Sequence, residues 1–447
     1  MKFTKFGKAL LMGALSAGVV VSLTSCVESY AVGYLYVTGT VTAQSSGEGI
    51  VSGFSIDHNT GRLTAIHGLP VASGGANPVR AVLLTGSRFL YVLNRGTSSN
   101  PSGSADCTTQ YPCANANITE FAVGANGILS AQGTFYTQGL NPFRLFADSS
   151  GNFLYALDHD APDNTQCSLA LGKGVNACGD ISVFKIDNTT GRLSLVQNAQ
   201  VTAANGTPLS YFPVPANPVD FAFASGSLIT LSGTASTNFP YTGGSLVFPY
   251  AYSAVTGQLT VSQNSSQPLG IGAGTALVYT GGYLYVLDNE PLTVNGITAS
   301  SQILPYTLGS GGALQAQVGG PVPDDVTLSN PIVMLIESKG NWAYVANQGN
   351  NTGTSGNAQS GIAGYVVDKT TKELTTLPGE PFGSGAGPQC IVEDPSNQFI
   401  YTANYNDSTV TGRMLDLNSG ELNNLTGGSS FALTGPPTWC LMDGRTN

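Results

Sequence analysis

Short apolar runs that end in an amide or a carboxylate recur along the chain and closely resemble one another. The segment RFLYVLNRG, at residues 88–96, returns four times in nearly the same form, at residues 152–160, 282–290, 341–349 and 398–406. A shorter relative, GYLYVTGT, occupies residues 33–40. Runs of this length, rich in aromatic and β-branched residues and bounded by Gly, Asn or Asp, are typical of buried β-strands. The chain therefore repeats one strand many times.

Each full unit adds three further strands to this one. A strand led by proline comes first, as in NPVRAVLL from Asn77 and NPFRLFAD from Asn141, and a tight turn joins it to the recurring strand. A third strand follows a longer loop, and a T-G-x-L turn leads into a fourth, as in NTTGRLSLV. Four antiparallel strands repeated every ~50–75 residues are the pattern of a β-propeller blade.

Counting the recurring strand predicts seven blades. The degenerate SLITLSG at Ser227 stands for the fourth, and GTALVYTGG at Gly274 replaces one proline-led strand. The first unit lacks its opening strand, whereas PPTWCLMDG at 436–444 is an opening strand with nothing after it. We therefore expect an all-β fold, a single seven-bladed propeller over residues 26–447. The C-terminal strand joins the N-terminal blade, which closes the ring and removes its free sheet edges.

The units resemble the YVTN-type repeats of the seven-bladed lactonase-like propellers, a group that includes bacterial 6-phosphogluconolactonases. Asn-Pro before the first strand, F-x-Y-V-x-N in the second and T-G-x-L between the third and fourth carry the resemblance over Tyr30–Asp443. It implies a propeller fold and lactone hydrolysis. Enzymes of this family are expected to carry an H-P-R-H-like run at the opening prolines, but NPVRAV, NPFRLF, NPVDFA and NPIVML contain no histidine.

The N-terminus predicts export and a lipid anchor. Lys2, Lys5 and Lys8 precede an apolar run, Ala9–Leu23, that ends in Leu-Thr-Ser-Cys. This pattern resembles a bacterial lipoprotein signal, so we expect residues 1–25 to be removed and Cys26 to be lipidated. The alternative is a plain secretory signal with an incidental cysteine. Val27 after Cys26 favours sorting to the outer membrane.

Six cysteines remain after Cys26, an even number that suits an oxidising compartment. Cys107 and Cys113 are close in sequence, as are Cys167 and Cys178, and each pair is expected to form a local disulfide. Counted from the opening prolines, Cys390 and Cys440 project from opposite faces of neighbouring blades, which places both in one gap and predicts a third bond. Two buried free thiols are the alternative for this last pair.

The charge balance limits the partners. Charged residues make up 9% of the chain and the net charge is -10, so nucleic acid, which requires clustered Lys and Arg, is not an expected partner. No C-x-x-C, H-E-x-x-H or G-x-S-x-G motif occurs. We expect no metal and no cofactor, although the acidic segment Asp158–Asp163 offers oxygen ligands in a spacing that no known calcium loop has.

The long connections all emerge on one face of the predicted ring, where the candidate site residues gather. Arg80 and Arg144 follow the opening proline by two residues and are suited to clamping an anion, with inter-blade ion pairing, such as Arg144 with Asp220, as the alternative. His159 is the histidine placed for general-base work, and a solvated loop position is its alternative. The expected ligand-binding residues at this face are Asn94, Arg95, Asp158, Asp220, Glu290, Asn347 and Asn404.

Two functions therefore compete. The first is a lipid-anchored binding or scaffold protein that presents its loop face to a glycan, peptide or protein. The second is a lactone hydrolase of the cell envelope that uses Arg80, Arg144 and His159. The missing histidines and the polar, weakly charged surface favour the first, and the family resemblance favours the second.

Overall fold

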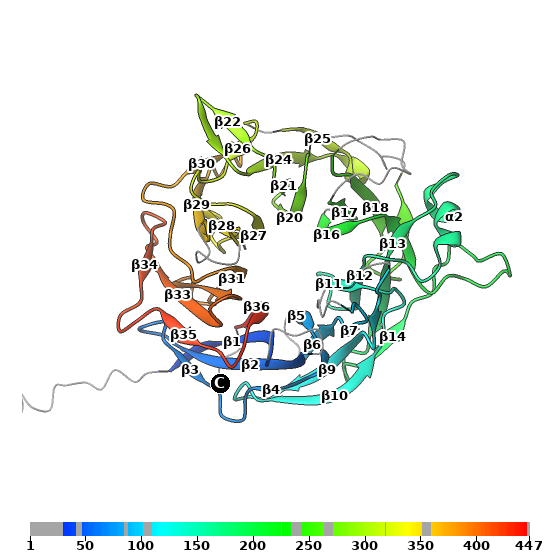
Figure 1. Ribbon diagram of the computed structural model, residues 1–447, viewed down its shortest axis with the longest axis horizontal. Coiled ribbons are helices and arrows are strands. Elements are labelled where there is room, and N and C mark those ends of the chain that lie inside the picture. The colour runs from blue at the N-terminus through cyan, green and yellow to red at the C-terminus, as the bar shows by residue number, and fades with distance from the viewer. Residues whose placement is uncertain are drawn as a thin grey trace, which may run out of the picture.

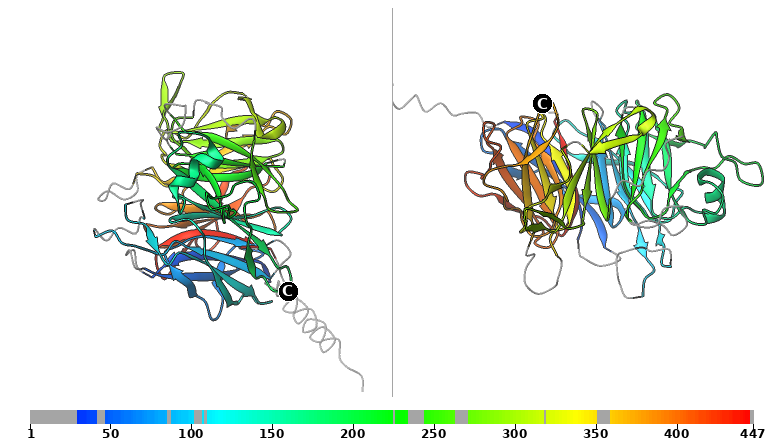
Figure 2. Two further views of the ribbon diagram at one scale, coloured as in Figure 1. Left: turned by 90° about the vertical axis from the view of Figure 1, so that its right-hand side faces the viewer. Right: turned by 90° about the horizontal axis from the view of Figure 1, so that it is seen from above.

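The computed structural model describes residues 30–41, 47–84, 88–101, 107, 110–224, 226–233, 244–262, 271–317, 319–350 and 359–444. The expected signal segment 1–25 and Cys26 lie outside these residues. Seven antiparallel sheets surround one axis in Figure 1, and Figure 2 shows the same ring edge-on. The predicted seven-bladed β-propeller is confirmed.

Every blade has four main strands, which run in chain order from the axis outward except in the first blade. Blade 1 contains β36 (Pro437–Asp443), β1 (Ala31–Thr40), β2 (Glu48–Asp57) and β3 (Leu63–Ala65). Blade 2 contains β5 (Pro78–Leu83), β6 (Phe89–Asn94), β9 (Asn117–Val123) and β10 (Leu129–Phe135). Blade 3 contains β11 (Pro142–Ala147), β12 (Phe153–Asp158), β13 (Cys178–Ile186) and β14 (Leu193–Leu195). Blade 4 contains β16 (Pro218–Ala224), β17 (Ser227–Ser232), β18 (Val247–Tyr252) and β19 (Leu259–Val261).

The remaining three blades follow the same plan. Blade 5 contains β20 (Gly274–Thr280), β21 (Tyr283–Asp288), β24 (Gln302–Leu308) and β25 (Leu314–Gln317). Blade 6 contains β27 (Pro331–Ile336), β28 (Trp342–Asn347), β29 (Gly361–Val367) and β30 (Leu374–Thr376). Blade 7 contains β31 (Pro388–Glu393), β32 (Phe399–Asn404), β33 (Thr409–Leu415) and β34 (Leu422–Asn424).

The ring closes as expected, because β36 pairs with β1 and becomes the innermost strand of blade 1. The sequence pattern did not predict the fifth strands that pair with the third strand of four blades, or two small hairpins. The fifth strands are β4 (Val71–Ala76), β15 (Phe212–Pro215), β26 (Val322–Pro323) and β35 (Ser430–Ala432). The hairpins are β7 (Thr97–Ser98) with β8 (Cys113–Ala114), and β22 (Leu292–Val294) with β23 (Ile297–Ala299).

The core of the ring lies between the blades. A separate cluster of buried apolar side chains fills each seam between neighbouring blades. In strand β6, Leu90 and Val92 pack toward blade 1, whereas Tyr91 and Leu93 pack toward blade 3. Because alternate side chains point to opposite faces and both faces are buried, the recurring strand is a continuous apolar run.

The tyrosine of the recurring strand also ties each blade to the next. Its hydroxyl donates to a backbone carbonyl in the turn between the third and fourth strands of the following blade, at 2.5–3.4 Å. The tyrosines are Tyr36, Tyr91, Tyr155, Tyr285, Tyr344 and Tyr401. In blade 4 the sequence places Ile229 at the corresponding position of β17, so the seam between blades 4 and 5 lacks this tyrosine hydrogen bond.

Helical structure is confined to two short 3₁₀ turns, at Asn164–Gln166 and Ser310–Gly312, and α2 (Cys167–Leu171) within the described residues. The excursion that carries α2 leaves blade 3 between β12 and β13 (Figure 1). None of the described helices has the length and apolar character that crossing a bilayer requires.

Candidate functional site

The innermost strands place one residue from each blade in an equivalent position near the axis. Each of these strands has a register shift directly after its opening residue, which is the geometry of a β-bulge. We call the residues that follow the bulge, two places after the opening position, the axial row. In the order of the blades they are Trp439, Arg80, Arg144, Asp220, Ala276, Val333 and Cys390.

The first four members of the axial row interact in sequence around the ring. The Arg80 guanidinium carbon lies 3.4 Å from the centroid of the Trp439 ring. Arg144 forms an ion pair with Asp220, with 3.3 Å between Nε and Oδ1. The second carboxylate oxygen of Asp220 accepts a hydrogen bond from the backbone N–H of Leu277 in blade 5, at 2.9 Å. The expected inter-blade ion pair of Arg144 with Asp220 is therefore confirmed.

Arg80 differs from Arg144 because, among the described residues, no carboxylate forms an ion pair with it. The residue is 6% exposed, and its Nε is buried with no hydrogen-bond partner among the described residues. Burial, with a smaller contribution from the neighbouring Arg144, lowers the pKa of Arg80 well below its usual value, while Asp220 acts in the opposite direction. A buried guanidinium next to a second one, without a carboxylate of its own, is an arrangement that an anion or a polarised carbonyl would stabilise.

His159 lies beside this pair and remains neutral. Its ring stacks on Phe143 with 3.8 Å between the centroids, and its backbone N–H donates to the carbonyl of Asn141. Burial lowers the pKa of His159 to about 3, and the positive charges of Arg95 and Arg144 contribute to that shift. A neutral imidazole can donate or accept a hydrogen bond, but a pKa so low makes it a weak proton acceptor. Its role as a general base stays a prediction.

Several of the expected ligand-binding residues lie inside the blades. Asn94, Asp158, Asn347 and Asn404 end the second strand of their blades and are fully buried. The Asn94 side-chain amide, for example, donates to Asn117 and to the hydroxyl of Thr119. These residues hold neighbouring strands and inter-blade connections together, and direct contact with a ligand stays a prediction for them.

The remaining expected residues differ in position. Arg95 directly follows β6 and donates to the carbonyl of Cys107 at 3.3 Å, so it belongs to the loop around the first disulfide. Glu290 is exposed beside Gly272 in the connection before blade 5. The structure thus brings Arg80, Arg144, Asp220, Arg95 and His159 into one group whose charges interact, and it leaves Glu290 on a different blade.

Two aromatic side chains of this group were not expected from the sequence. Trp439 provides the surface on which Arg80 stacks, and Phe143 provides the surface on which His159 stacks. Trp439 follows Pro437 by two residues, as Arg80 follows Pro78. An alignment of the closing strand with the other proline-led strands would therefore have found it.

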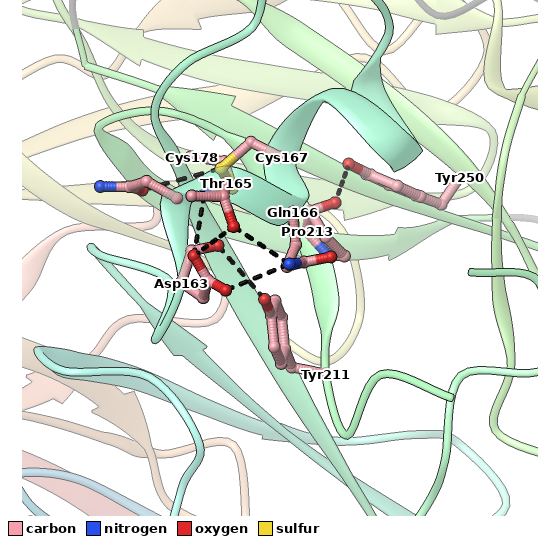
Figure 3. The surroundings of a disulfide bond; sticks show 9 residues. Asp163, Thr165, Gln166, Cys167, Cys178, Tyr211, Pro213 and Tyr250 are labelled. Atoms are coloured by element: carbon pink, nitrogen blue, oxygen red, sulfur yellow. Dashed lines mark hydrogen bonds between the residues drawn. A yellow bond between two sulfur atoms is a disulfide. The ribbon is translucent and has the colours of Figure 1, made fainter. Parts of the chain in front are cut away.

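All three expected disulfides are present: Cys107–Cys113, Cys167–Cys178 and Cys390–Cys440. The last joins the innermost strands of blades 7 and 1 and lies in their shared apolar seam. Figure 3 shows how Cys167 at the start of α2 is linked to Cys178 at the start of β13. Three bonds of this kind indicate that the chain folds outside the cytoplasm.

The acidic segment after β12 does not converge on one point. The Asp163 carboxylate accepts a hydrogen bond from the backbone N–H of Thr165 at 2.9 Å and so caps the 3₁₀ turn before α2 (Figure 3). Asp160 instead bonds the side-chain amide of Asn141. Within the described residues, no group of three or more His, Cys, Asp or Glu side chains is placed to hold a metal ion.

Comparison with known proteins supports a lactonase-like propeller. Residues 293–437 match the sequence model of the family described as lactonase, 7-bladed beta-propeller. The 6-phosphogluconolactonase of Bacillus subtilis (strain 168) is 38% identical over 87 residues, a match that spans 19% of this chain and 24% of that enzyme. The match to this curated relative is therefore confined to about a quarter of its length.

Solved structures extend the similarity to nearly the whole chain. The periplasmic gluconolactonase of Pseudomonas aeruginosa has a TM-score of 0.63 and 15% identity, with 93% of this chain and 99% of that chain covered. A protein of Bacteroides uniformis described as a candidate 6-phosphogluconolactonase has a TM-score of 0.61 and 13% identity, with 92% and 99% covered. At such identities the likeness shows the fold alone. The chain is thus a lactonase-like propeller in fold, with sequence similarity to that family over residues 293–437.

Proposed function

We propose that this chain is a lactone hydrolase of the cell envelope that acts on a sugar lactone near the ring axis. The observation that carries the proposal is Arg80, a buried cation whose Nε has no hydrogen-bond partner among the described residues, next to a second guanidinium. The similarity to 6-phosphogluconolactonases in sequence and to a gluconolactonase in fold supports this reaction class over other reactions of carbonyl compounds.

The arrangement suits ester hydrolysis in a specific way. Water adds to the lactone carbonyl carbon, the ring C–O bond breaks, and the product is a hydroxy acid. A preorganised cation stabilises the negative charge that develops on the carbonyl oxygen. The carboxylate of the product carries the same charge. In this proposal Arg80 and Arg144 hold the oxygen, and the Asp220 carboxylate fixes the orientation of the Arg144 guanidinium.

His159 has a limited part in this scheme. As a neutral imidazole it can accept a hydrogen bond from the attacking water and orient it. Because its pKa is lowered to about 3, it does not become a stable imidazolium at neutral pH. We therefore assign it the positioning of water and expect its removal to affect the rate less than the removal of either arginine.

The proposed location is a lipid anchor at Cys26 after removal of residues 1–25, at the outer membrane. The first described strand supports a particular orientation. Ala31 pairs with Asp57 next to the turn that starts β3, whereas Gly39, at the other end of β1, pairs with Pro437 near the axial row. A chain that enters at Tyr30 therefore leaves the face with the axial row and the long loops pointing away from the anchor.

A binding module for an anionic ligand is the second candidate, because the Arg144–Asp220 ion pair and the weakly basic His159 are compatible with capture without turnover. In this case a glycan, peptide or protein with a carboxylate or phosphate would occupy the same position. Arg80 would neutralise its charge.

Acid release from a panel of aldonolactones, measured in a pH-stat above the spontaneous rate, tests the two candidates. We expect turnover by the purified mature protein and a loss of about 10²-fold in kcat for Arg80→Met or Arg144→Gln, the effect of removing one oxyanion donor. Arg192→Ala, an exposed arginine in a turn of blade 3, is the matched control and should leave the rate unchanged.

Calorimetric titration with the corresponding aldonates completes the design. If no lactone is hydrolysed but aldonates bind and Arg80→Met abolishes that binding, the hydrolase proposal is wrong and the binding module stands. If both arginine variants hydrolyse lactones at the wild-type rate, the axial row is not the site of the reaction.

A further inference from the structure

In several blades the last residue of the second strand faces a residue at or near the start of the third strand, and this pair is polar. In blade 2 the amide of Asn94 donates to the side-chain oxygen of Asn117 at 2.9 Å. In blade 5 the amide of Gln302 donates to Asp288 at 3.0 Å. In blade 7 the amide of Asn404 donates to the hydroxyl of Thr409 at 3.1 Å. Each of these pairs contains a donor.

Blade 3 has two acids at this position. Asp158 at the end of β12 faces Asp180 in β13, and both side chains are fully buried. Side chains directly opposite one another in antiparallel strands have Cβ atoms about 5 Å apart. A Cβ added to Gly139 would lie 2.2 Å from Oδ1 of Asp180 and 2.4 Å from Cγ of Asp158. The backbone of the preceding connection therefore lies against both carboxyl groups.

One oxygen of each acid has a partner and the other does not. The Thr137 hydroxyl donates to Oδ1 of Asp158 at 3.3 Å, and the Ser182 hydroxyl donates to Oδ2 of Asp180 at 3.4 Å. Oδ2 of Asp158 and Oδ1 of Asp180 are buried without a hydrogen-bond partner in the described part of the chain. Two buried carboxylates with uncompensated oxygens cannot both remain ionised at low cost.

The surrounding charges do not supply compensation. Burial raises the pKa of Asp158 well above its usual value, and Asp160 adds to the shift. Burial also raises the pKa of Asp180, with further contributions from Asp158 and Asp160. Tyr211 and His159 are further titratable neighbours: burial raises the pKa of Tyr211 to about 12, with Asp180 contributing, and lowers the pKa of His159 to about 3. Within the described residues, no lysine or arginine is among the groups that shift the pKa of either carboxyl group.

We propose that Asp158 and Asp180 bind one proton between them at neutral pH, as a buried carboxylic acid–carboxylate pair. The proton resides on one of the two free oxygens, Oδ2 of Asp158 or Oδ1 of Asp180, and is donated to the other. The pair then has the donor that an amide or a hydroxyl supplies in blades 2, 5 and 7. This inference does not depend on the proposed lactonase activity.

The proton makes the base of the α2 excursion sensitive to pH. Asp158 is the last residue before the excursion, and Asp180 follows Cys178, which closes the excursion through its disulfide with Cys167 (Figure 3). Since the folded pair holds a proton that the unfolded carboxylates release above their ordinary pKa, its stabilising contribution is present at acid pH. It is lost as the pH rises through the raised pKa of the folded pair.

Thermal unfolding of wild type, Asp180→Asn and Asp288→Asn between pH 5 and pH 8.5 tests the proposal. An asparagine at 180 supplies a permanent donor, so the Tm difference between this variant and wild type should increase by several degrees in favour of the variant as the pH rises. Asp288 already accepts from Gly272 N, Ala273 N and Gln302 Nε2. Asp288→Asn should therefore be destabilised at every pH, with the slope of wild type.

Two further measurements decide the matter if a variant does not fold. The infrared difference spectrum, wild type minus Asp158→Asn at pH 7, should contain the C=O stretch of a protonated carboxylic acid, because Glu380, whose pKa burial raises to about 7, contributes equally to both spectra. Absence of that band in the difference spectrum, or equal pH slopes for wild type and Asp180→Asn, would overturn the proposal. A rise in Tm with added CaCl₂ that is reversed by EDTA and absent in Asp180→Asn would also overturn it, because a cation would then replace the proton.

Discussion

The blades on the two sides of the axis use the same backbone position for different purposes. In blades 2, 3 and 4 the axial row carries Arg80, Arg144 and Asp220, which are charged and interact with one another. In blades 5, 6 and 7 it carries Ala276, Val333 and Cys390, which pack into the apolar seams. One half of the row is therefore charged, and the other half takes part in the apolar packing that holds the ring together.

The comparison shows how a repeated fold accommodates a buried charged side chain that lowers the stability of the folded state. A buried guanidinium without a counterion destabilises the folded state, so Arg80 needs compensation from elsewhere. Its stacking on Trp439 supplies part of this compensation. The closing strand that carries Trp439 is also joined to blade 7 by Cys390–Cys440. The apolar half of the axial row thus stabilises the ring, and this stability offsets the free-energy cost of burying the charged half.

The largest expected effect comes from removing the closing strand. A chain that ends at Gly435 loses β36, which provides the innermost strand of blade 1 and one half of the disulfide at the seam. Without it β1 becomes an exposed edge near the axis, and we expect the cooperative thermal transition in near-UV circular dichroism to be lost. Shortening the β22–β23 hairpin is the control, because this hairpin forms a separate two-stranded sheet. Equal melting of the two deletion variants would contradict the role given to the seam.

The next largest effect is the loss of stability when a disulfide is removed, and its size should differ among the three disulfides. Cys390–Cys440 closes 50 residues of chain, and in the chain-entropy model its removal costs about 4 kcal/mol of the free energy of unfolding. The bonds that close 6 and 11 residues should contribute about 2 and about 3 kcal/mol in the same model. Urea unfolding of the three double Cys→Ser variants gives this order, and a larger loss for Cys107→Ser with Cys113→Ser would refute it.

The fold could be predicted from the sequence because both faces of every blade are buried. This makes the recurring strand apolar along its length, so seven copies are visible even where one, at Ser227, is degenerate. Strand parity also predicted the Cys390–Cys440 bond, since the face on which a side chain lies depends on counting by two. The fifth strands could not be predicted in this way. They include segments such as Phe212–Pro215, in which alternate prolines interrupt the strand pattern.

The site could be predicted only in part, because position along a strand does not reveal burial. Arg80, Arg144 and Asp220 were found from their spacing after proline, and the repeat makes that spacing reliable. Asn94, Asn347 and Asn404 occupy an equally regular position at the ends of strands, yet they are fully buried. The inter-blade connections that cover them precede the innermost strand of the same blade and carry no pattern that would show where they fold back.

The third prediction concerns the difference between the two halves of the axial row. Arg80→Met replaces a buried charge that Trp439 compensates only in part by an apolar side chain of similar length, which should raise the free energy of unfolding by about 1–3 kcal/mol. Val333→Ala in the apolar half should lower it by about 1 kcal/mol because it removes two partly buried methyl groups. Denaturant unfolding of both variants measures the two changes. If Arg80→Met is less stable than wild type, then the stacking on Trp439 and the attraction of Asp220 outweigh the cost of burying the Arg80 charge.

The smallest expected effect is on the pH dependence of activity. His159 has a pKa of about 3, lowered chiefly by burial and further by Arg95 and Arg144, so its charge does not change between pH 5 and pH 8. If lactone hydrolysis occurs at the axial row, kcat/KM should show no step near pH 6.5, and His159→Asn should preserve the shape of the profile. A step near pH 6.5 that disappears in His159→Asn would show that the imidazole is protonated in the working enzyme.

The lowered pKa of His159 also makes stability depend on pH. The unfolded chain binds a proton at His159 below about pH 6.5, and the folded chain does not until about pH 3, so the contribution of the neutral His159 to stability is lost as the pH falls. It opposes the contribution of Asp158 and Asp180, which is lost as the pH rises, and comparing His159→Asn with Asp180→Asn across one pH series separates the two.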